Sequence, residues 1–172
     1  MLKLIGAALV TAGATGLGVS YRQDLKDRLY HTKCLYTILE LLESEISYSK
    51  AALPEACRMI SHRTKKPYSS GLYNVWKIMN SNSGLTFSLV WKQEMGKCMH
   101  DIPIGSTEKE EFLNFAESTG YADNQMQLKM LEKCKKSVGE AIKHQEERME
   151  NKSKVVMSMG LIGGLLLTIV LL

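Results

Sequence analysis

Charged side chains are absent from both ends of this chain and frequent between them. No charged residue occurs in the runs Val155–Leu172 and Leu4–Val19. A helix of about 20 apolar residues crosses a hydrocarbon core of roughly 30 Å. The C-terminal run also lacks the polar stripe of an amphipathic helix. We therefore predict membrane-spanning helices at residues 1–21 and 153–172, on either side of a helical domain at residues 22–152.

The N-terminal run is the weaker of the two, and a second interpretation of it stays open. The small residues Gly16 and Gly18 provide a cleavage site for a secretory signal peptide. Only Lys3 precedes the run, however, and no polar break separates it from the helix that follows. These two features favour an uncleaved span that extends to Tyr21, whose ring suits the membrane interface.

Basic residues flank both runs on the side of the central domain. They are Arg22, Lys26, Arg28, Arg148, Lys152 and Lys154. Positively charged flanks of spanning helices stay in the cytoplasm. The sequence therefore predicts a cytoplasmic central domain, with both termini on the other side of the membrane.

The central region has the apolar periodicity of helices. Apolar residues recur at steps of three and four in six segments: 22–48, 54–66, 70–79, 86–99, 107–120 and 123–151. No stretch alternates apolar and polar residues over six positions, and no Asn-Gly or Asp-Gly turn occurs. We predict an all-α fold, a six-helix bundle whose break at 80–84 separates two three-helix halves. The first and last segments have no breaker before the terminal runs, so each is predicted to continue into its span.

Three helix starts have local signals. Pro54 suits a first helical position, and Asp123 is a favourable N-cap. Thr107 and Glu110 have the spacing of a capping box, which predicts a start at Thr107.

Composition and cysteine spacing narrow the class of protein. A net charge of +4 over 172 residues suits a protein beside an anionic membrane and does not indicate nucleic acid as a partner. The four cysteines are far apart, unlike those of a disulfide framework or a zinc site. We predict reduced thiols at Cys34, Cys57, Cys98 and Cys134.

The sequence contains none of the common catalytic motifs. It has no phosphate-binding Gly-x-x-x-x-Gly-Lys loop, no Gly-x-Ser-x-Gly elbow and no His-Glu-x-x-His pair. The four histidines, His31, His62, His100 and His144, lie on separate segments. We therefore predict a protein that is not an enzyme and that has no cofactor or metal. Two rival interpretations stay open: a membrane-bound enzyme that uses these histidines or Cys98 with His100, and a generic helical membrane adaptor.

Small residues are spaced four apart in both predicted spans. Ala8, Ala12 and Gly16 share one helical face, and Gly160 and Gly164 form a Gly-x-x-x-Gly pair. Such faces let helix backbones approach closely in lipid, although small residues are common in membrane helices in general. The pattern predicts that the spans pack on each other or on other subunits.

Several short motifs together resemble a known family. They are Leu42, Glu43, Glu45, Ile46 and Tyr48, then Leu53, Pro54, Glu55 and Ala56, with the opening Met1–Gly6, the spacing of Gly120, Asp123 and Gln127, and the closing Met159–Leu165. Their order over the whole chain is similar to that of the stage III sporulation protein AB family of endospore-forming bacteria. One departure is Ala52, where family members often carry proline.

The resemblance implies a function that composition does not show. The family is encoded among the components of a channel between mother cell and forespore. Its cytoplasmic domain is similar to the F-domain of the inner-membrane platform protein of type II secretion systems, a six-helix bundle of two three-helix halves. The resemblance implies a location at the outer forespore membrane, with the domain in the mother-cell cytoplasm. It implies a secretion-type ATPase and other channel subunits as partners, and no catalytic residues.

The residues for partner binding are a hypothesis drawn from where the motifs cluster. Glu43 and Glu45 end the first central segment, and Pro54, Glu55 and Ala56 begin the second. The acidic residues there are consistent with a solvated patch or with a docking surface. We predict that these five residues form a corner that faces the ATPase. The chain is also expected to contact the lipid bilayer and to form homo-oligomers.

Overall fold

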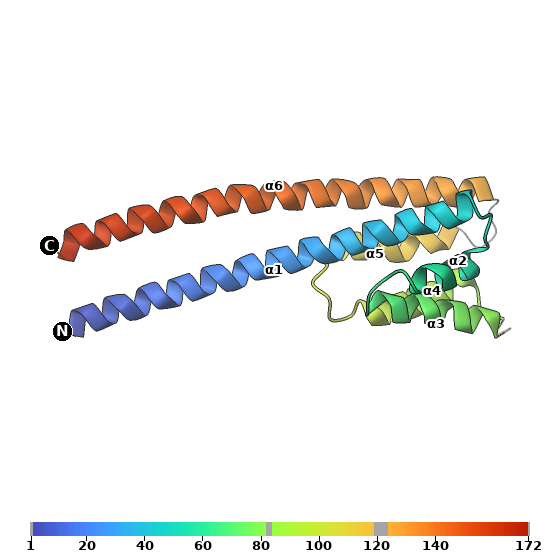
Figure 1. The fold of residues 1–172 in the computed structure, drawn as a ribbon, viewed down its shortest axis with the longest axis horizontal. Coiled ribbons are helices and arrows are strands. Elements are labelled where there is room, and N and C mark those ends of the chain that lie inside the picture. The colour runs from blue at the N-terminus through green and yellow to red at the C-terminus, as the bar shows by residue number, and fades with distance from the viewer. Residues whose placement is uncertain (1, 82–83, 119–123, 172) are drawn as a thin grey trace.

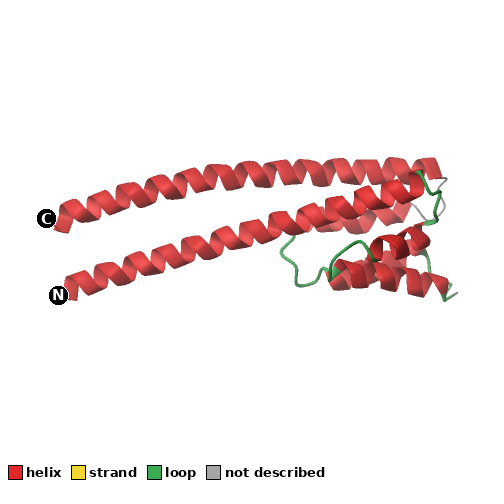
Figure 2. Cartoon of the chain, in the orientation of Figure 1, coloured by secondary structure: helices red, strands yellow, loops and turns green. Residues whose placement is uncertain are grey.

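All described elements of the computed structural model are helical. It describes residues 2–81, 84–118 and 124–171, with only the backbone described for 2–21, 118, 124 and 151–171. The elements are α1 (Leu2–Ser47), α2 (Leu53–Ser61), α3 (Tyr68–Asn80), α4 (Phe87–Cys98), α5 (Ser106–Asn114), the short 3₁₀ helix η1 (Phe115–Ser118) and α6 (Asn124–Leu171). No strand occurs among these residues (Figure 2). The predicted all-α class and the six α-helices are confirmed.

Two long helices give the molecule its shape. Helices α1 and α6 run side by side in opposite directions, and both termini lie at the same end (Figure 1). The short helices α2 to α5 gather against the other end of this pair. With a rise of 1.5 Å per residue, the 46 residues of α1 span about 69 Å. The prediction that the first and last central segments continue into the terminal runs is confirmed for the backbone.

The membrane-spanning segments are not settled by the described residues. Within those residues, no helix combines the length and the apolar character needed to cross a bilayer. The side chains of the predicted spans, residues 1–21 and 153–172, lie outside the described part of the chain. The same is true of the small residues predicted to pack there: Ala8, Ala12, Gly16, Gly160 and Gly164. The domain boundaries at 22 and 152 therefore stay a prediction.

Two ion pairs set the register of α1 against α6. Lys33 Nζ lies 2.6 Å from Glu146 Oε1, and Glu43 pairs with Lys135. Glu43 follows Lys33 along α1, whereas its partner Lys135 precedes Glu146 along α6 by a similar distance. These ties fix the antiparallel alignment at two levels along the pair.

One hydrophobic core joins all the helices. From α1 it takes Leu35, Ile38, Leu39, Leu42 and Ile46, which recur at helical spacing on one face. Leu25 and Leu29, which continue this face toward the N-terminus, are only half-buried. The short helices cover only the C-terminal part of the described α1 (Figure 1), so the core ends before these leucines.

An aromatic cluster fills the core between α4 and α5. Trp91 is fully buried, and its ring centroid lies 4.9 to 5.8 Å from those of Phe87, Phe112 and Phe115. Its indole Nε1 donates a hydrogen bond to the Phe112 carbonyl at 3.0 Å. The indole therefore ties α4 to α5 by packing and by a polar contact.

Helix pairing crosses the predicted midpoint of the chain. Helix α3 packs on α4, and α1 packs on α6. Both pairs join elements from opposite sides of residues 80–84. The described buried residues form a single core cluster, to which both predicted halves contribute.

Of the three predicted helix starts, one is confirmed, one is wrong and one is not covered by the described residues. Pro54 lies in the first turn of α2, and the Thr86 hydroxyl caps α4 by accepting from the Leu89 amide at 3.4 Å. Helix α5 begins at Ser106 with Gly105 as its N-cap. The predicted capping box with its start at Thr107 is therefore wrong. The predicted N-cap Asp123 lies outside the described residues.

Candidate partner-binding site

The turn between α1 and α2 lies at the end of the molecule remote from both termini (Figure 1). Lys50 adopts the left-handed conformation, with φ of 51°, and the Ala51 amide bonds back to the Glu45 carbonyl at 3.3 Å. A left-handed residue just past a helix is a common way to end it. Pro54 then starts α2, since its missing amide proton would be unpaired there. The predicted corner is thus a tight reversal between two helices.

Two of its predicted carboxylates make contacts within the chain. Glu45 is only 12% exposed, and its Oε1 accepts from Arg63 Nη1 at 2.9 Å. Its Oε2 accepts from the Ser49 hydroxyl at 2.9 Å. Glu43 pairs with Lys135 of α6, and this hydrogen bond raises the pKa of the lysine. Both carboxylates therefore have cationic partners within the chain.

The third carboxylate belongs to a small surface network on α2. Glu55 Oε1 accepts from Arg58 at 2.6 to 2.7 Å, which lowers the pKa of Glu55 and raises that of Arg58. The Arg58 guanidinium stands 5.8 Å from the ring centroid of Trp76, within cation–π range. The surface of the corner is therefore a set of paired charges and aromatic rings.

The five predicted residues are brought together but are not equally accessible. Ala56 is fully buried in the core, whereas Pro54 is half-buried. Tyr48 is 85% exposed beside them. Sequence reasoning did not assign Tyr48 to the site, although it belongs to the motif that carries the family resemblance. An aromatic residue at the polar end of a helix was the available signal.

The histidines and cysteines have ordinary structural surroundings. Burial lowers the pKa of His31, whose Nδ1 lies 3.0 Å from the Tyr68 hydroxyl. His100 contacts Asp101 on the surface, while Cys98 donates to the Met95 carbonyl. Burial raises the pKa of Cys98 to about 11, which leaves little of the reactive thiolate at neutral pH. Among the described residues, no three His, Cys, Asp or Glu side chains are grouped to hold a metal ion.

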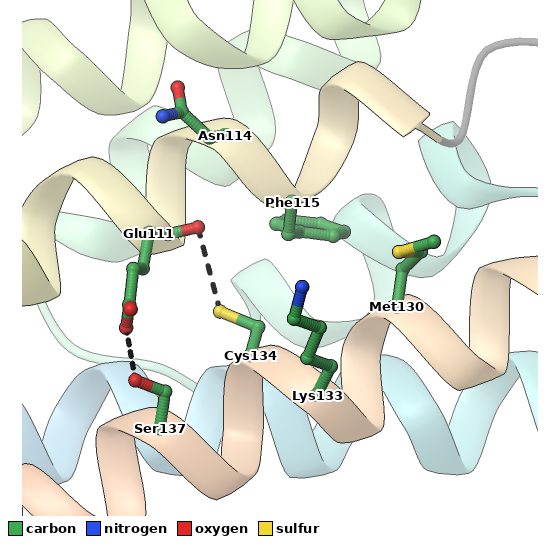
Figure 3. A pocket seen from close by; sticks show the side chains of 7 residues that line it. All are labelled: Glu111, Asn114, Phe115, Met130, Lys133, Cys134 and Ser137. Carbon is green, nitrogen blue, oxygen red and sulfur yellow. Dashed lines mark hydrogen bonds between the residues drawn. The ribbon is translucent and has the colours of Figure 1, made fainter.

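A cleft of about 230 Å³ between α5, η1 and α6 contains the most plausible nucleophile (Figure 3). Cys134 donates from its thiol to the Glu111 carbonyl at 3.6 Å. The Glu111 carboxylate is hydrogen-bonded to Ser137. Burial raises the pKa of Cys134 to about 12, so this thiol is protonated at neutral pH. The polar groups around it form hydrogen bonds within the chain. The Cys134 thiol in this cleft is therefore not activated as a nucleophile.

These features define an all-helical protein in which two long antiparallel helices, α1 and α6, carry a small bundle of short helices at one end. The profile of the Stage III sporulation protein AB family matches residues 3–172, and the chain belongs to this family. The family resemblance read from the sequence motifs is confirmed.

Two comparisons agree with this assignment. The chain is 24% identical over 172 residues to Stage III sporulation protein AB of Bacillus subtilis (strain 168), and the match covers 100% of each chain. A solved structure of Stage III sporulation protein AB (SpoIIIAB) is similar with a TM-score of 0.64 and 20% identity. That match covers 72% of this chain and 97% of the other, and it supports the fold.

Proposed function

We propose that this protein is a non-enzymatic membrane platform of the channel between mother cell and forespore. Its terminal segments, 1–21 and 153–172, would anchor it in the outer forespore membrane. Its bundle would lie in the mother-cell cytoplasm and dock a secretion-type ATPase. Support comes from the sporulation family, the uncharged terminal runs and the basic residues beside them.

The observation that carries the proposal is the placement of the termini and the α1–α2 turn at opposite ends of the molecule. Both termini lie at one end, and the α1–α2 turn lies at the other (Figure 1). If α1 leaves the membrane at Arg22, the 26 residues to Ser47 extend about 39 Å into the cytoplasm. The turn is then the part of the chain that a cytoplasmic partner meets first.

The chemistry of the turn suits protein docking. Tyr48 presents an exposed ring at the tip, and aromatic residues are common hot spots of protein interfaces. Glu55 and Arg58 lie nearby as an exposed ion pair that a partner can join. We therefore assign docking to Tyr48, Glu55 and Arg58, with Glu43 and Glu45 holding the surface in shape.

A pull-down of the ATPase by the full-length chain tests this proposal. Tyr48→Ala should lower binding by roughly tenfold or more, as expected for an aromatic hot spot. Tyr30→Ala is the matched control, since Tyr30 is also exposed (51%) but lies on α1, closer to the N-terminus. A folded protein with both Tyr48→Ala and Glu55→Lys is the decisive variant. If it binds the ATPase as strongly as the unsubstituted chain does, docking at this corner is refuted.

Charge reversal at Glu43 and Glu45 needs a folding control. Each reversal also breaks an internal ion pair with Lys135 or Arg63, so loss of ATPase binding counts only if the helical content is unchanged. Experiments in sporulating cells distinguish the proposed platform from the two rival functions, an enzyme and a generic adaptor. An enzyme should lose function when all four histidines become alanine, and a generic adaptor could be deleted without harm to the forespore.

A further inference from the structure

The helical hairpin of α2 and α3 carries the excess positive charge of this chain. Residues 50–81 contain six lysines and arginines and a single acidic residue, Glu55, which gives the segment a net charge of +5. The whole chain has a net charge of +4, so the residues outside the segment together carry −1. The basic residues of the segment are Lys50, Arg58, Arg63, Lys65, Lys66 and Lys77.

Most of these cations have no carboxylate partner. Arg58 pairs with Glu55, and Arg63 pairs with Glu45 of α1. The four lysines of the segment are exposed, and none of them has an ion pair within 4 Å in the part of the chain that the structure describes. Like charges gathered on one hairpin repel one another, and an anionic partner relieves that repulsion.

Aromatic rings lie among these charges where α2 meets α3. The Arg58 guanidinium stands 5.8 Å from the Trp76 ring centroid, and the Trp76 and Tyr73 centroids are 5.4 Å apart. Tyr73 is 43% exposed, and Lys77 follows it by one turn on the same side of α3. We call Glu55, Arg58, Tyr73, Trp76 and Lys77 the α2–α3 face. Rings that neighbouring side chains already hold in place lose little conformational freedom when a partner binds.

The α2–α3 face lies on the outside of the bundle. Helix α3 packs mainly on α2 and α4, and it lies on the side of the bundle away from α6 (Figure 1). Glu55 is in the first turn of α2, directly after the α1–α2 turn. The face therefore continues the docking corner of the proposed function along α2 and α3. The turn at 62–67, with Lys65 and Lys66, lies at its other end.

We propose that the α2–α3 face binds an acidic segment of the ATPase, an inference that rests on the proposed function. Lys65, Lys66 and Lys77 contact carboxylates of this segment. The Tyr73 and Trp76 rings contact an apolar side chain within it, as aromatic residues do at the centres of protein interfaces. Complementary charge of this kind speeds association and selects the partner.

A protein segment suits this face better than a nucleic acid or a bilayer does. A nucleic acid would stack its bases on exposed rings, but Arg58 already covers a face of the Trp76 ring. Glu55 and Arg58 lie beside the α1–α2 turn, at the end of the molecule remote from both termini (Figure 1). The proposed attachment of the termini thus places this end of the face away from the membrane.

A zero-length carbodiimide crosslinker tests the contact directly, because it joins a lysine amine only to a carboxylate that touches it. The full-length chain in detergent micelles is mixed with the purified ATPase and crosslinked, and the joined peptides are identified by mass spectrometry. Lys65, Lys66 and Lys77 should be joined to aspartates or glutamates of the ATPase. If these lysines are joined only to a second copy of this chain, or to nothing, the inference is overturned.

Charge reversal measures how much the contact contributes to binding. Lys65→Glu, Lys66→Glu and Lys77→Glu together should weaken ATPase binding on the order of tenfold, because attraction becomes repulsion. Raising sodium chloride from about 50 to about 300 mM should weaken binding by the unsubstituted chain severalfold and have little effect on this triple variant. The crosslinks are measured on the unsubstituted chain, so they decide the inference even if a variant does not fold.

The matched control makes the same change in net charge at exposed positions of α6, with Lys129→Glu, Lys136→Glu and Lys143→Glu. An equal loss of ATPase binding in both triple variants would indicate general charge attraction and overturn the inference. Loss of binding to anionic phospholipid vesicles, with ATPase binding intact, would assign the lysines to the membrane surface and also overturn it. An unsubstituted chain that does not bind the ATPase refutes the proposed docking itself, whereas intact binding by the α2–α3 triple variant refutes only this inference.

Discussion

Replacing Trp91 with phenylalanine tests the account of the core. The indole is fully buried among three phenylalanine rings, and it donates to the Phe112 carbonyl at 3.0 Å. That carbonyl belongs to the last turn of α5, where intrahelical partners are scarce. Trp91→Phe keeps an aromatic ring and removes both the donor and part of the packed volume.

The expected loss of stability follows from these contacts. Loss of this buried hydrogen bond costs about 2 kcal/mol. The smaller ring leaves a cavity that adds about 1 kcal/mol. The total is about 3 kcal/mol in the free energy of unfolding. For a chain of this length, that corresponds to a fall in Tm of about 6–12 °C.

Thermal and urea unfolding of the full-length protein, followed by circular dichroism, measure the change. Trp76→Phe is the control, because Trp76 is half-buried at the surface beside Arg58 and should cost less than about 1 kcal/mol. If Trp91→Phe lowers Tm no more than Trp76→Phe does, the buried indole does not have the role in stability assigned to it.

Three further predictions concern a glycine, a histidine and a thiol. A Cβ at Gly105 would lie 1.9 Å from Glu108 Oε2 and 2.2 Å from Arg28 Nη2, so Gly105→Ala should displace both groups and cost about 1–2 kcal/mol in urea unfolding. Burial lowers the pKa of His31 in the folded state, so the unfolded state takes up the proton first as pH falls. The free energy of unfolding should therefore decrease below about pH 6.5 and be restored above it, which urea titrations across this range measure. The pKa of Cys134, raised to about 12, should make its alkylation at pH 8 far slower than in urea, as peptide mass mapping would show.

Each of these three has a control and a contrary outcome. Gly96→Ala places a Cβ in open space within α4 and should not destabilise, so equal losses at both glycines would exclude the steric argument. His31→Gln should reduce the pH dependence, and an unchanged pH profile would show that other groups cause it. Labelling of Cys134 at the same rate in folded and unfolded protein would contradict its burial.

The helices were predictable because their signals are local. Apolar residues at steps of three and four indicated the segments, while Pro54 indicated the start of α2. The start of α5 was not predictable from spacing alone. The Lys109 amide bonds to the Gly105 carbonyl at 2.9 Å, and Gly105 lies beneath the Arg28–Glu108 pair. The spacing of Thr107 and Glu110 therefore did not identify the first residue of α5.

The assignment of partner binding to the α1–α2 corner stays a prediction, and the electrostatics of this corner were not predictable from the sequence. The motif around Glu43 and Glu55 located the corner. The cations that pair with its acidic side chains are distant in the sequence, since Arg63 is 18 residues from Glu45 and Lys135 is 92 from Glu43. Only the packing of α1 on α6 and α2 brings these charges together. Glu43 and Glu45 are therefore paired with cations within the chain.

The antiparallel pairing of α1 and α6 has a mechanical consequence. The ties Lys33–Glu146 and Glu43–Lys135 oppose sliding of one helix along the other. Neither backbone is interrupted between 2 and 47 or between 124 and 171. The pair is thus a stiff strut with no hinge along it. A force applied at the α1–α2 turn would reach the chain ends as a tilt or a thrust of the whole rod.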